Sequence, residues 1–378
     1  MRIFLFALGL VAILLPAHAR AQTDFETIAE AAILIDYPSR QVLYAKNADE
    51  PRPPASMSKL MTAFMVFERL EEGQWSLDDR LLVSEKAWRM GGSKMFVEVG
   101  ERVRVEDLLR GIIIQSGNDA CIVVAEAMAG TEAAFAQQMT ERARELGLPQ
   151  SDFKNASGWP DPEHVMSVRD LAHLAAEIIA RFPQFYHLYS EESFTYADIT
   201  QGSRNPLLQG GVAGVDGLKT GHTSDAGYGL VASAERHGRR LILVVAGLET
   251  PGERRREAER LLEHGFRAFQ SYELFAGGET IEEVPVWFGD RARVPLVARD
   301  DVAVTLSLTA RDDLRVDLAY RAPLEAPIEA GTAVGELRIA APEIEARTVP
   351  VVVGEDVGRA GVFGRMWTAL RHLAGMGS

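Results

Sequence analysis

A short stretch near the start of the chain limits what the sequence can fold into. Pro53 and Pro54 end any preceding element, because proline has no backbone N–H and biases the residue before it away from the helical region. Residues 60–70 are apolar on almost every face of a helix, which predicts a buried helix. Lys59 stands in the first turns of this helix, although lysine is almost never fully buried unless it is paired.

The residue three positions before this lysine offers a partner. Ser56 and Lys59 lie on the same helix face, because residues three apart are neighbours on a helix surface. A hydroxyl at the start of a helix, beside an amine in an apolar setting, is an arrangement that activates a nucleophile. The alternative is that Ser56 caps the helix and Lys59 extends its amine to solvent. Ser-x-x-Lys is a loose pattern, so the choice depends on the rest of the chain.

The composition excludes several classes of function. The chain has 378 residues, of which 47% are hydrophobic, enough for one large domain and a smaller one. Its formal charge of −14 argues against a nucleic-acid partner. Cys121 is the single cysteine, which excludes an intramolecular disulfide and a multi-cysteine zinc site. The eight histidines show no ligand spacing, so we expect no metal and no cofactor.

The first residues have the features of a secretory signal peptide, which we expect over 1–21. Arg2 forms a short basic region, and 3–15 is a nearly continuous apolar run that is too short to span a bilayer comfortably. Small residues at 17, 19 and 21 offer cleavage sites. The sequence therefore predicts an exported protein.

The region 22–275 predicts an α/β (α+β) domain with an antiparallel sheet flanked by helices. Strands are expected at 30–36, 41–45, 214–221, 227–235 and 240–248, and the main helices at 56–72, 105–114, 120–128, 132–146, 168–180 and 253–269. Strands at both ends of the region, with helices between them, fit a sheet that joins the termini of its own domain.

The pattern of apolar and polar residues changes after residue 278. Within 280–354, we expect short strands at 284–288, 302–308, 314–318 and 348–353, separated by turn residues. This pattern predicts a small all-β domain.

The last part of the chain predicts an amphipathic helix over 357–375. One helical face carries Phe363, Trp367 and Leu370, and the segment is basic although the protein is acidic. Such a helix fits the interface of a membrane with anionic lipid. The alternative is a helix that docks on the core of the protein itself.

Three short motifs follow one another along the chain: Ser56-Met57-Ser58-Lys59, Ser116-Gly117-Asn118 and Lys219-Thr220-Gly221. Each alone is weak, because Ser-Gly-Asn is more often a turn and Lys-Thr-Gly more often the end of an exposed strand. Their joint occurrence in this order matches the signature of penicillin-binding proteins and class A β-lactamases, in which Ser-Asp-Asn is the middle motif. Here Gly117 replaces that aspartate.

With these motifs the chain closely resembles the low-molecular-weight penicillin-binding proteins of the 5/6 type, which are D-alanyl-D-alanine carboxypeptidases. The resemblance covers essentially the whole mature chain and includes the residues flanking the motifs at 113–121, 221–223 and 286–290. It implies the fold of serine β-lactamases and DD-peptidases. It also implies removal of the terminal D-alanine from peptidoglycan pentapeptides, inhibition by β-lactam antibiotics, and a peripheral location on the periplasmic face of the inner membrane.

The resemblance also implies the chemical roles of the motif residues. Ser56 would attack the carbonyl between the two D-alanines and form an acyl-enzyme, with Lys59 as general base. Ser116 would pass a proton to the leaving amine, and Asn118 would hold Lys59 and the substrate amide. The backbone N–H groups of Ser56 and His222 would form the oxyanion hole.

The substrate carboxylate requires cations and donors. By resemblance these are Lys219, Thr220 and Gly221 with Arg254, although its neighbours Arg255 and Arg256 offer the same chemistry. For Lys59 to act as a base its amine must be neutral, which requires a pKa lowered by burial and by a nearby cation such as Lys219.

Two further residues are expected to line the cleft. Ser93 lies in the glycine-rich stretch 90–96, and Ser157 stands where the family often has histidine, so no proton-transfer role follows for it. Cys121 on its apolar helix is expected to be a buried and inert thiol.

The motifs are compatible with more than one activity. A β-lactamase shares the acylation step but needs fast deacylation, and no clear counterpart of the class A glutamate is found. A DD-endopeptidase would carry the same three motifs, and a non-catalytic penicillin-binding module of the cell wall is the non-enzymatic hypothesis. The sequence determines neither the diamino acid of the substrate nor the oligomeric state, and a homodimer is among the states it allows.

Overall fold

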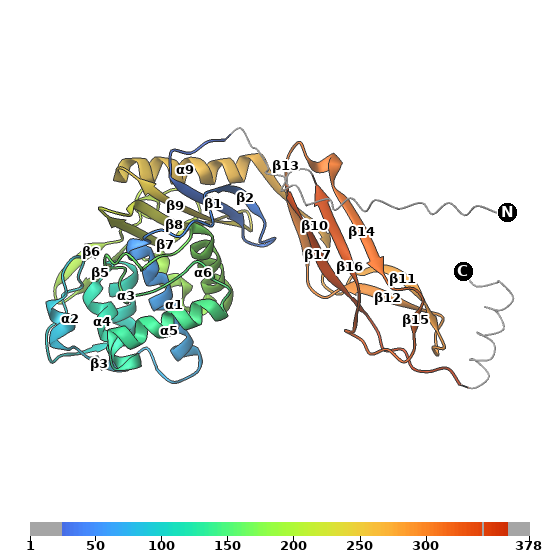
Figure 1. The fold of residues 1–378 in the computed structure, drawn as a ribbon, viewed down its shortest axis with the longest axis horizontal. Coiled ribbons are helices and arrows are strands. Elements are labelled where there is room, and N and C mark those ends of the chain that lie inside the picture. Colours follow the sequence, from blue (N-terminus) through green and yellow to red (C-terminus); the bar gives the residue numbers. More distant parts are fainter. Residues whose placement is uncertain (1–24, 342–343, 362–378) are drawn as a thin grey trace, which may run out of the picture.

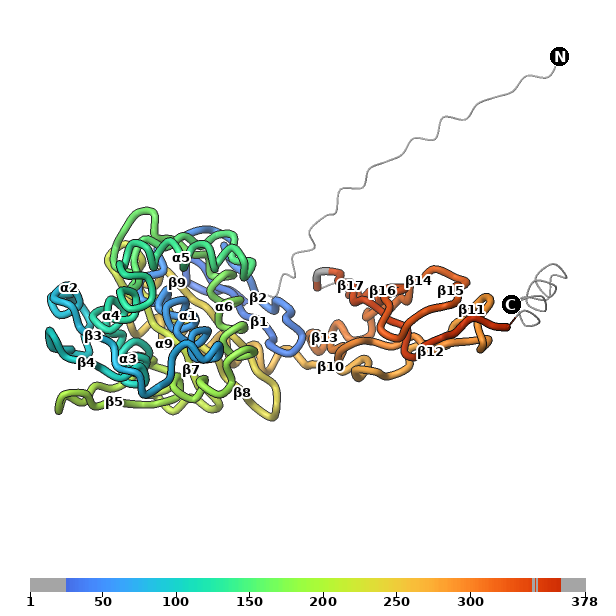
Figure 2. The backbone as a smooth tube through the Cα atoms, turned by 90° about the horizontal axis from the view of Figure 1, so that it is seen from below, coloured from blue at the N-terminus to red at the C-terminus, as the bar shows by residue number. Residues whose placement is uncertain are grey.

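The computed structural model describes residues 25–341 and 344–361, which form two domains in line (Figures 1 and 2). The first combines one sheet with helices on both faces, and the second is all β. Both parts of the expected fold class are therefore confirmed. The expected signal peptide at 1–21 and residues 362–375 of the expected C-terminal helix lie outside the described residues.

The sheet of the first domain is antiparallel, with the strand order β2-β1-β9-β8-β7. Its strands are β1 (Ala31–Asp36), β2 (Val42–Lys46), β7 (Val215–Thr223), β8 (Gly227–Arg236) and β9 (Arg239–Leu248). The N-terminal hairpin thus pairs with strands some two hundred residues later, as predicted from strands at both ends of the domain.

The sheet is covered on both faces, and alternate residues of each strand serve the two sides. Ile33 and Val244 pack into the larger core with the helices of the middle of the chain. Leu34 and Leu243 pack into the smaller core under α9 (Pro251–Ala268), which crosses the opposite face (Figure 1). The continuous apolar runs of these strands follow from this double burial.

The remaining helices and short strands of the first domain lie between β2 and β7. The helices are η1 (Ala55–Ser58), α1 (Lys59–Glu71), α2 (Glu85–Arg89), α3 (Val105–Ile113), α4 (Asn118–Ala129), α5 (Glu132–Glu145), α6 (Val168–Arg181), α7 (Pro183–Tyr186), η2 (His187–Ser190) and α8 (Pro206–Gln209). Two short hairpins join β3 (Arg80–Leu82) to β4 (Arg102–Arg104) and β5 (Ser193–Tyr196) to β6 (Ile199–Gly202).

Local sequence explains where the main helices start and stop. Every residue of α1 from Lys59 to Phe67 is buried, as expected for a helix that is apolar on all faces. The helix ends before Gly73, whose φ of +67° is the left-handed conformation that a helix stop requires. The hydroxyl of Ser167 accepts from the backbone of Asp170 and caps α6.

The second domain contains more strands than the four predicted. They are β10 (Phe269–Phe275), β11 (Thr280–Trp287), β12 (Arg293–Ala298), β13 (Val302–Ser307), β14 (Arg315–Tyr320), β15 (Leu324–Glu325), β16 (Ala333–Ala341) and β17 (Ile344–Val353). Strand β10 pairs with β13, although we expected residues up to 275 to belong to the first domain. No turn residue separates α9 from β10, so the sequence shows no break at 269.

The start of the expected C-terminal helix is extended, which corrects the prediction for 357–361. Val357 exchanges backbone hydrogen bonds with Ile328 in an isolated bridge, and its side chain is buried in the core of the second domain. Arg359 forms a second bridge with Gly289. Backbone pairing and apolar burial thus hold these residues in the β domain.

Polar side chains join the two domains at the β1–β2 turn. Gln41 bonds through its side chain to both the N–H and the carbonyl of Thr305 on β13, and Arg347 donates to the carbonyl of Ser39. Behind the turn, buried Asp36 pairs with Arg239 at 2.7 Å. Hydrogen bonds therefore join the β1–β2 turn of the first domain to strands β13 and β17 of the second.

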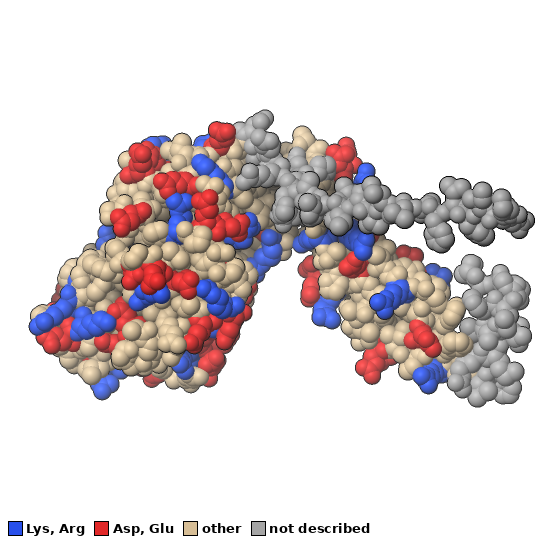
Figure 3. Space-filling view, viewed as in Figure 1, with Lys and Arg blue, Asp and Glu red and all other residues tan. Residues whose placement is uncertain are grey.

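Charged side chains of both signs are interspersed over the visible face of the two domains (Figure 3). Among the described residues, no helix has the length and the apolar character needed to cross a membrane.

Candidate active site

The hydroxyl of Ser56 and the amine of Lys59 meet at the start of the buried helix α1. Lys59 Nζ lies 2.7 Å from Ser56 Oγ. The lysine side chain is 1% exposed, so it does not reach solvent. The serine lies in the 3₁₀ turn η1, and no side-chain capping bond is made at the start of η1 or α1. The geometry thus favours the paired arrangement over the capping alternative.

The turn that carries Ser56 is packed closely by two other backbone segments. Ala55 has φ +48°, an unusual conformation for a residue with a side chain. A Cβ atom on Gly158 would lie 1.9 Å from the Ala55 carbonyl oxygen, and a Cβ on Gly221 would lie 2.7 Å from that of Pro54. Only glycine fits at these two positions, which brings both segments against the backbone just before the serine.

Burial sets the protonation of Lys59. Removal of the amine from water lowers its pKa from 10.5 to about 8, and the carboxylate of Asp119 opposes part of this shift. Roughly a tenth of Lys59 is therefore neutral at pH 7 and able to take a proton, compared with less than one part in a thousand for an ordinary lysine. The second hydrogen bond of the amine goes to the carbonyl oxygen of Ser157 at 2.6 Å.

The carbonyl of Ser157 belongs to a tight turn. The side-chain oxygen of Asn155 accepts from the backbone N–H groups of Ser157, Gly158 and Trp159 at 2.8–3.1 Å. The amide nitrogen of Asn155 donates to the Trp159 carbonyl at 2.9 Å. One asparagine therefore fixes the whole turn and with it the acceptor for Lys59.

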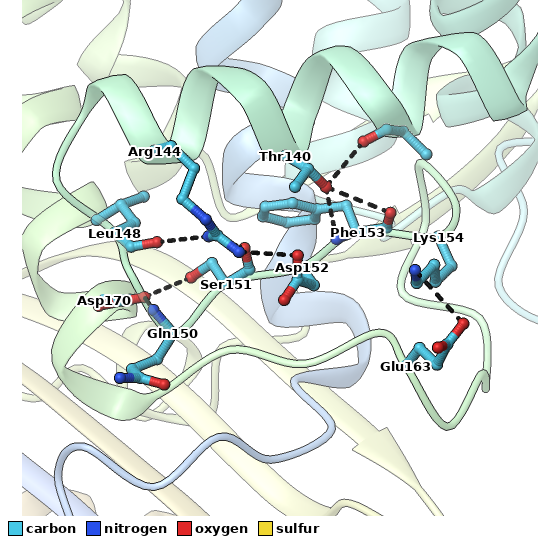
Figure 4. Close-up of polar contacts among 11 residues, drawn as sticks. Thr140, Arg144, Leu148, Gln150, Ser151, Asp152, Phe153, Lys154, Glu163 and Asp170 are labelled. Atoms are coloured by element: carbon cyan, nitrogen blue, oxygen red, sulfur yellow. Dashed lines mark hydrogen bonds and ion pairs between the residues drawn. The ribbon is translucent and has the colours of Figure 1, made fainter.

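The longer segment 148–165 that contains this turn is fastened to α5 and α6 (Figure 4). Arg144 on α5 pairs with Asp152 at 2.8 Å. Asp170 on α6 accepts from the hydroxyl of Ser151 at 2.7 Å. An antiparallel bridge between residues 152 and 165 closes the segment at its base. The position of the Ser157 carbonyl thus depends on ion pairs and hydrogen bonds well outside the site.

The Ser-Gly-Asn motif connects α3 to α4. Ser116 has φ +60°, and the Gly117 N–H donates to the carbonyl of Gly111 at 2.8 Å. A Cβ on Gly117 would come within 2.9 Å of the Asp119 side chain and 3.1 Å of the Met95 backbone, so an aspartate at 117 would require this region to rearrange.

Asp119 is a structural residue that the motifs did not indicate. Its buried carboxylate accepts from the backbone N–H groups of Met95, Phe96 and Val97. It thereby holds the glycine-rich loop 90–96 against the start of α4. The acidic residue after the motif was visible in the sequence, but no pattern showed that it binds a loop some twenty residues earlier.

The amide of Asn118 also bonds to this loop. Its side chain donates to the Gly91 carbonyl at 2.9 Å, and its backbone N–H donates to the carbonyl of Ser93 at 2.8 Å. The expected loop at 90–96 thus lies beside the site, and Ser93 contacts Asn118 through its backbone. The expected contact of Asn118 is with Lys59, whereas its hydrogen bonds here are with the loop.

Lys219 projects from β7 into the site, and its amine donates to the backbone carbonyl of Thr220 at 3.2 Å. Lys219 is 2% exposed, and its amine donates to the hydroxyl of Ser116 at 2.9 Å. Burial, followed by the charge of Lys59, lowers the pKa of Lys219 well below its usual value. The two lysines are thus electrostatically coupled, and each has a serine hydroxyl as a partner.

Of the three consecutive arginines, Arg254 is the one whose side chain points toward β7 and β8. Its guanidinium lies 5.5 Å from the ring centre of Tyr228, and the same ring stacks on His222 at 3.8 Å. The Nε of Arg254 is buried and has no hydrogen-bond partner among the described residues. Arg255 lies against Gly210 instead, and Arg256 is exposed.

Arg204 is a further cation that the motifs did not indicate. After burial and the charge of Lys59, the charges of Arg204 and Arg254 also contribute to lowering the pKa of Lys219. Cys121 is fully buried, and burial raises the pKa of its thiol to about 12, so the thiol is protonated as expected. No cluster of potential metal ligands occurs in the described part of the chain.

The structure therefore brings the three motifs together around one serine. Ser56, Lys59, Ser116 and Lys219 form two hydrogen-bonded pairs, and Thr220, Gly221 and His222 follow along β7. The charges of Arg254 and Arg204 both act on Lys219. Such a set can activate a hydroxyl next to a neutral amine and receive an anionic group beside it.

The contact at Gly158 makes a testable prediction about stability. Substitution by alanine should lower the free energy of unfolding by about 3 kcal/mol, because it adds a backbone clash to an unfavourable φ. Gly130 is the matched control: it has the same φ of +76° and no atom within 4 Å of an added Cβ. Gly130→Ala should cost only about 1 kcal/mol. Urea unfolding measures both, and equal losses would contradict the close approach at Gly158.

Comparisons with known proteins agree with this geometry. The profile of the peptidase S11 family, D-alanyl-D-alanine carboxypeptidase, matches residues 17–250, and that of the penicillin-binding protein 5 C-terminal domain matches 269–359. The D-alanyl-D-alanine carboxypeptidase DacC of Escherichia coli (strain K12) is 39% identical over 90% of this chain and 86% of its own length.

Two solved structures give the same result in three dimensions. Penicillin-binding protein 5 from Haemophilus influenzae is 36% identical, with a TM-score of 0.84 over 89% of this chain and 100% of that chain. Penicillin-binding protein D2 from Listeria monocytogenes, in its ampicillin-bound form, is 32% identical, with a TM-score of 0.60 over 65% of this chain and 100% of that chain. The chain belongs to the S11 family of D-alanyl-D-alanine carboxypeptidases.

Proposed function

We propose that this enzyme removes the terminal D-alanine from peptidoglycan pentapeptides through an acyl-enzyme on Ser56. The observation that carries the assignment is the 2.7 Å contact between the Ser56 hydroxyl and the buried amine of Lys59. Burial lowers the pKa of this amine. The family of the chain and its ampicillin-bound structural relative support the same chemistry.

In the first step the amine of Lys59 takes the proton of the Ser56 hydroxyl. The serine oxygen attacks the carbonyl carbon between the two D-alanines and forms a tetrahedral intermediate. The developing negative charge on the carbonyl oxygen accepts hydrogen bonds from the backbone N–H groups of Ser56 and His222. The close contact of Gly221 with Pro54 supports this pairing of the two donors.

Collapse of the intermediate breaks the C–N bond. The proton that Lys59 took passes to the leaving amine through the hydroxyl of Ser116, which Lys219 orients at 2.9 Å, and Lys59 is neutral again. Free D-alanine departs and the acyl group stays on Ser56. Water then attacks the ester, with Lys59 again as base, and releases the shortened peptide.

The carboxylate of the terminal D-alanine binds on the β7 side. Lys219, Thr220 and Arg254 provide cations and a hydroxyl there. The buried Nε of Arg254 lacks a partner among the described residues, so an incoming carboxylate would supply the acceptor that this donor lacks. This contact gives Arg254 a role that its exposed neighbours cannot share.

A β-lactam enters the same pathway as far as the acyl-enzyme. Its ring carbonyl takes the place of the peptide carbonyl, and Ser56 becomes acylated. We further propose that the protein works at the periplasmic face of the inner membrane, held there by the basic, apolar segment 362–378. The expected export signal and the peptidoglycan substrate support this location.

Labelled penicillin tests the assignment of the nucleophile. Wild type should form a stoichiometric covalent adduct, and Ser56→Ala should form none, because the alanine has no oxygen to be acylated. Ser58→Ala is the matched control, since Ser58 Oγ bonds to the Ala55 carbonyl instead of Lys59. Equal labelling of wild type and Ser56→Ala would refute the assignment. A wild type that binds penicillin but releases no D-alanine from a pentapeptide would indicate a binding module instead.

The pH dependence of acylation tests the role of Lys59. Only the neutral amine can accept a proton, so the rate of penicillin acylation should fall by roughly tenfold per pH unit below the pKa. The apparent pKa should lie near 8, as burial of Lys59 dictates, and it belongs to the coupled pair with Lys219. The same series with Ser56→Ala corrects for hydrolysis of the drug. A rate that is constant from pH 6 to 9 would exclude Lys59 as the base in this range.

Truncation tests the membrane proposal. Removal of residues 362–378 should abolish sedimentation with anionic lipid vesicles while D-alanine release stays unchanged. The cut follows Gly361, because Val357 and Arg359 belong to the β domain and should be kept. Wild type on neutral vesicles is the control, and its binding should be weaker because the charge attraction is lost. Undiminished sedimentation of the truncated protein would contradict the proposal.

A further inference from the structure

A large aromatic side chain stands at the site without a role in the chemistry. Trp159 follows the carbonyl that holds Lys59 by two residues, yet it is 46% exposed. Its backbone is fixed on both sides by Asn155, at 2.9 Å for its N–H and 2.9 Å for its carbonyl. Asn155 therefore fixes the backbone that presents a half-exposed indole ring two residues from the acceptor of Lys59.

The inner edge of this ring lies over two glycines. A Cβ added to Gly91 would lie 3.6 Å from the ring, and one added to Gly92 would lie 3.1 Å from it. The carbonyl of Gly91 accepts from the Asn118 side chain, so only the backbone of this loop lies between the ring and the Ser-Gly-Asn motif. The absence of side chains at 91 and 92 leaves room for the edge of the indole against the loop.

The position of Trp159 relative to the nucleophile identifies which half of the substrate can reach it. The turn 155–159 and β7 both approach the backbone before Ser56 closely, the turn through Gly158 at Ala55 and the strand through Gly221 at Pro54. The β7 side carries the cations that suit the carboxylate of the leaving D-alanine. With the leaving D-alanine on the β7 side, the acyl half can extend toward the turn 155–159, where the Trp159 side chain is half-exposed.

We propose that Trp159 is a specificity-determining residue that contacts the side chain of the amino acid preceding the two D-alanines. An indole face buries methylene groups well and has few conformations to lose on binding. The chemical class it fits is a peptide whose third-from-last residue has a long aliphatic stem. This inference rests on the proposed function and adds a contact to the acyl half of the substrate.

Two peptides that differ only in that side chain test the proposal. One is diacetyl-L-lysyl-D-alanyl-D-alanine, with a long stem, and the other is acetyl-L-alanyl-D-alanyl-D-alanine, with a single methyl group. For Trp159→Ala we expect kcat/KM on the lysyl peptide to fall about tenfold further than on the alanyl peptide, mainly through KM. Trp159→Phe, which keeps an aromatic face, should restore most of the preference.

Leu308→Ala provides the control, because this leucine is also exposed but lies in the second domain after β13. It should leave the ratio of the two kcat/KM values unchanged. Equal losses of Trp159→Ala on both peptides, or loss of penicillin acylation, would show that the ring only supports the loop and would overturn the proposal. A wild type that releases D-alanine from neither peptide would instead contradict the proposed activity itself.

Discussion

The enclosure of the Lys59 amine is the constraint on which the rest of the structure depends. A charged amine in an apolar core is strongly disfavoured, so it must find polar partners or lose its proton. Here it does both: it bonds to Ser56 Oγ and Ser157 O, and its pKa falls. The helix that builds the core of the first domain therefore also supplies the base for catalysis. Stability and function share one element, which explains why the helix is apolar on every face around a lysine.

Such a buried amine can be positioned only if three distant backbone segments meet within a few ångströms. The turn before Ser56, the turn at 155–159 and strand β7 approach so closely that Gly158 and Gly221 have no room for a side chain. Each segment is fixed by contacts outside the site. Anchors on α5 and α6 hold the second segment, and the antiparallel sheet holds β7. The precision of the site is thus a property of the whole first domain.

Much of this arrangement could be predicted from sequence, for a physical reason. The strands and helices of the first domain are buried on at least one face, so their hydrophobic patterns are strong, and the motif serines and lysines are distinctive side chains. What could not be predicted depends on backbone groups or on three-dimensional proximity. The Ser157 carbonyl gives no signal in a sequence, and Arg254 differs from Arg255 and Arg256 only in the direction it points on α9. The second domain was under-predicted because its strands are partly exposed: β16, for example, has nine residues but buries only two of them fully. Strand β10 follows α9 directly, so no turn residue marks where it begins. Val357 pairs with Ile328 through backbone hydrogen bonds, which the sequence does not show.

The two lysines of the site also show why one short motif cannot specify a mechanism. Lys59 and Lys219 are both fully enclosed, and the pKa of each is lowered by burial, and that of Lys219 further by the charge of Lys59, so the site holds fewer protons than two isolated amines would. Each lysine has its own serine partner, because Ser56 Oγ bonds to Lys59 and Ser116 Oγ bonds to Lys219. One pair is suited to remove a proton from the nucleophile and the other to deliver a proton to the leaving group. The three motifs lie on different elements, the first at the start of α1, the second between α3 and α4 and the third on β7, so only the folded domain brings the two pairs together.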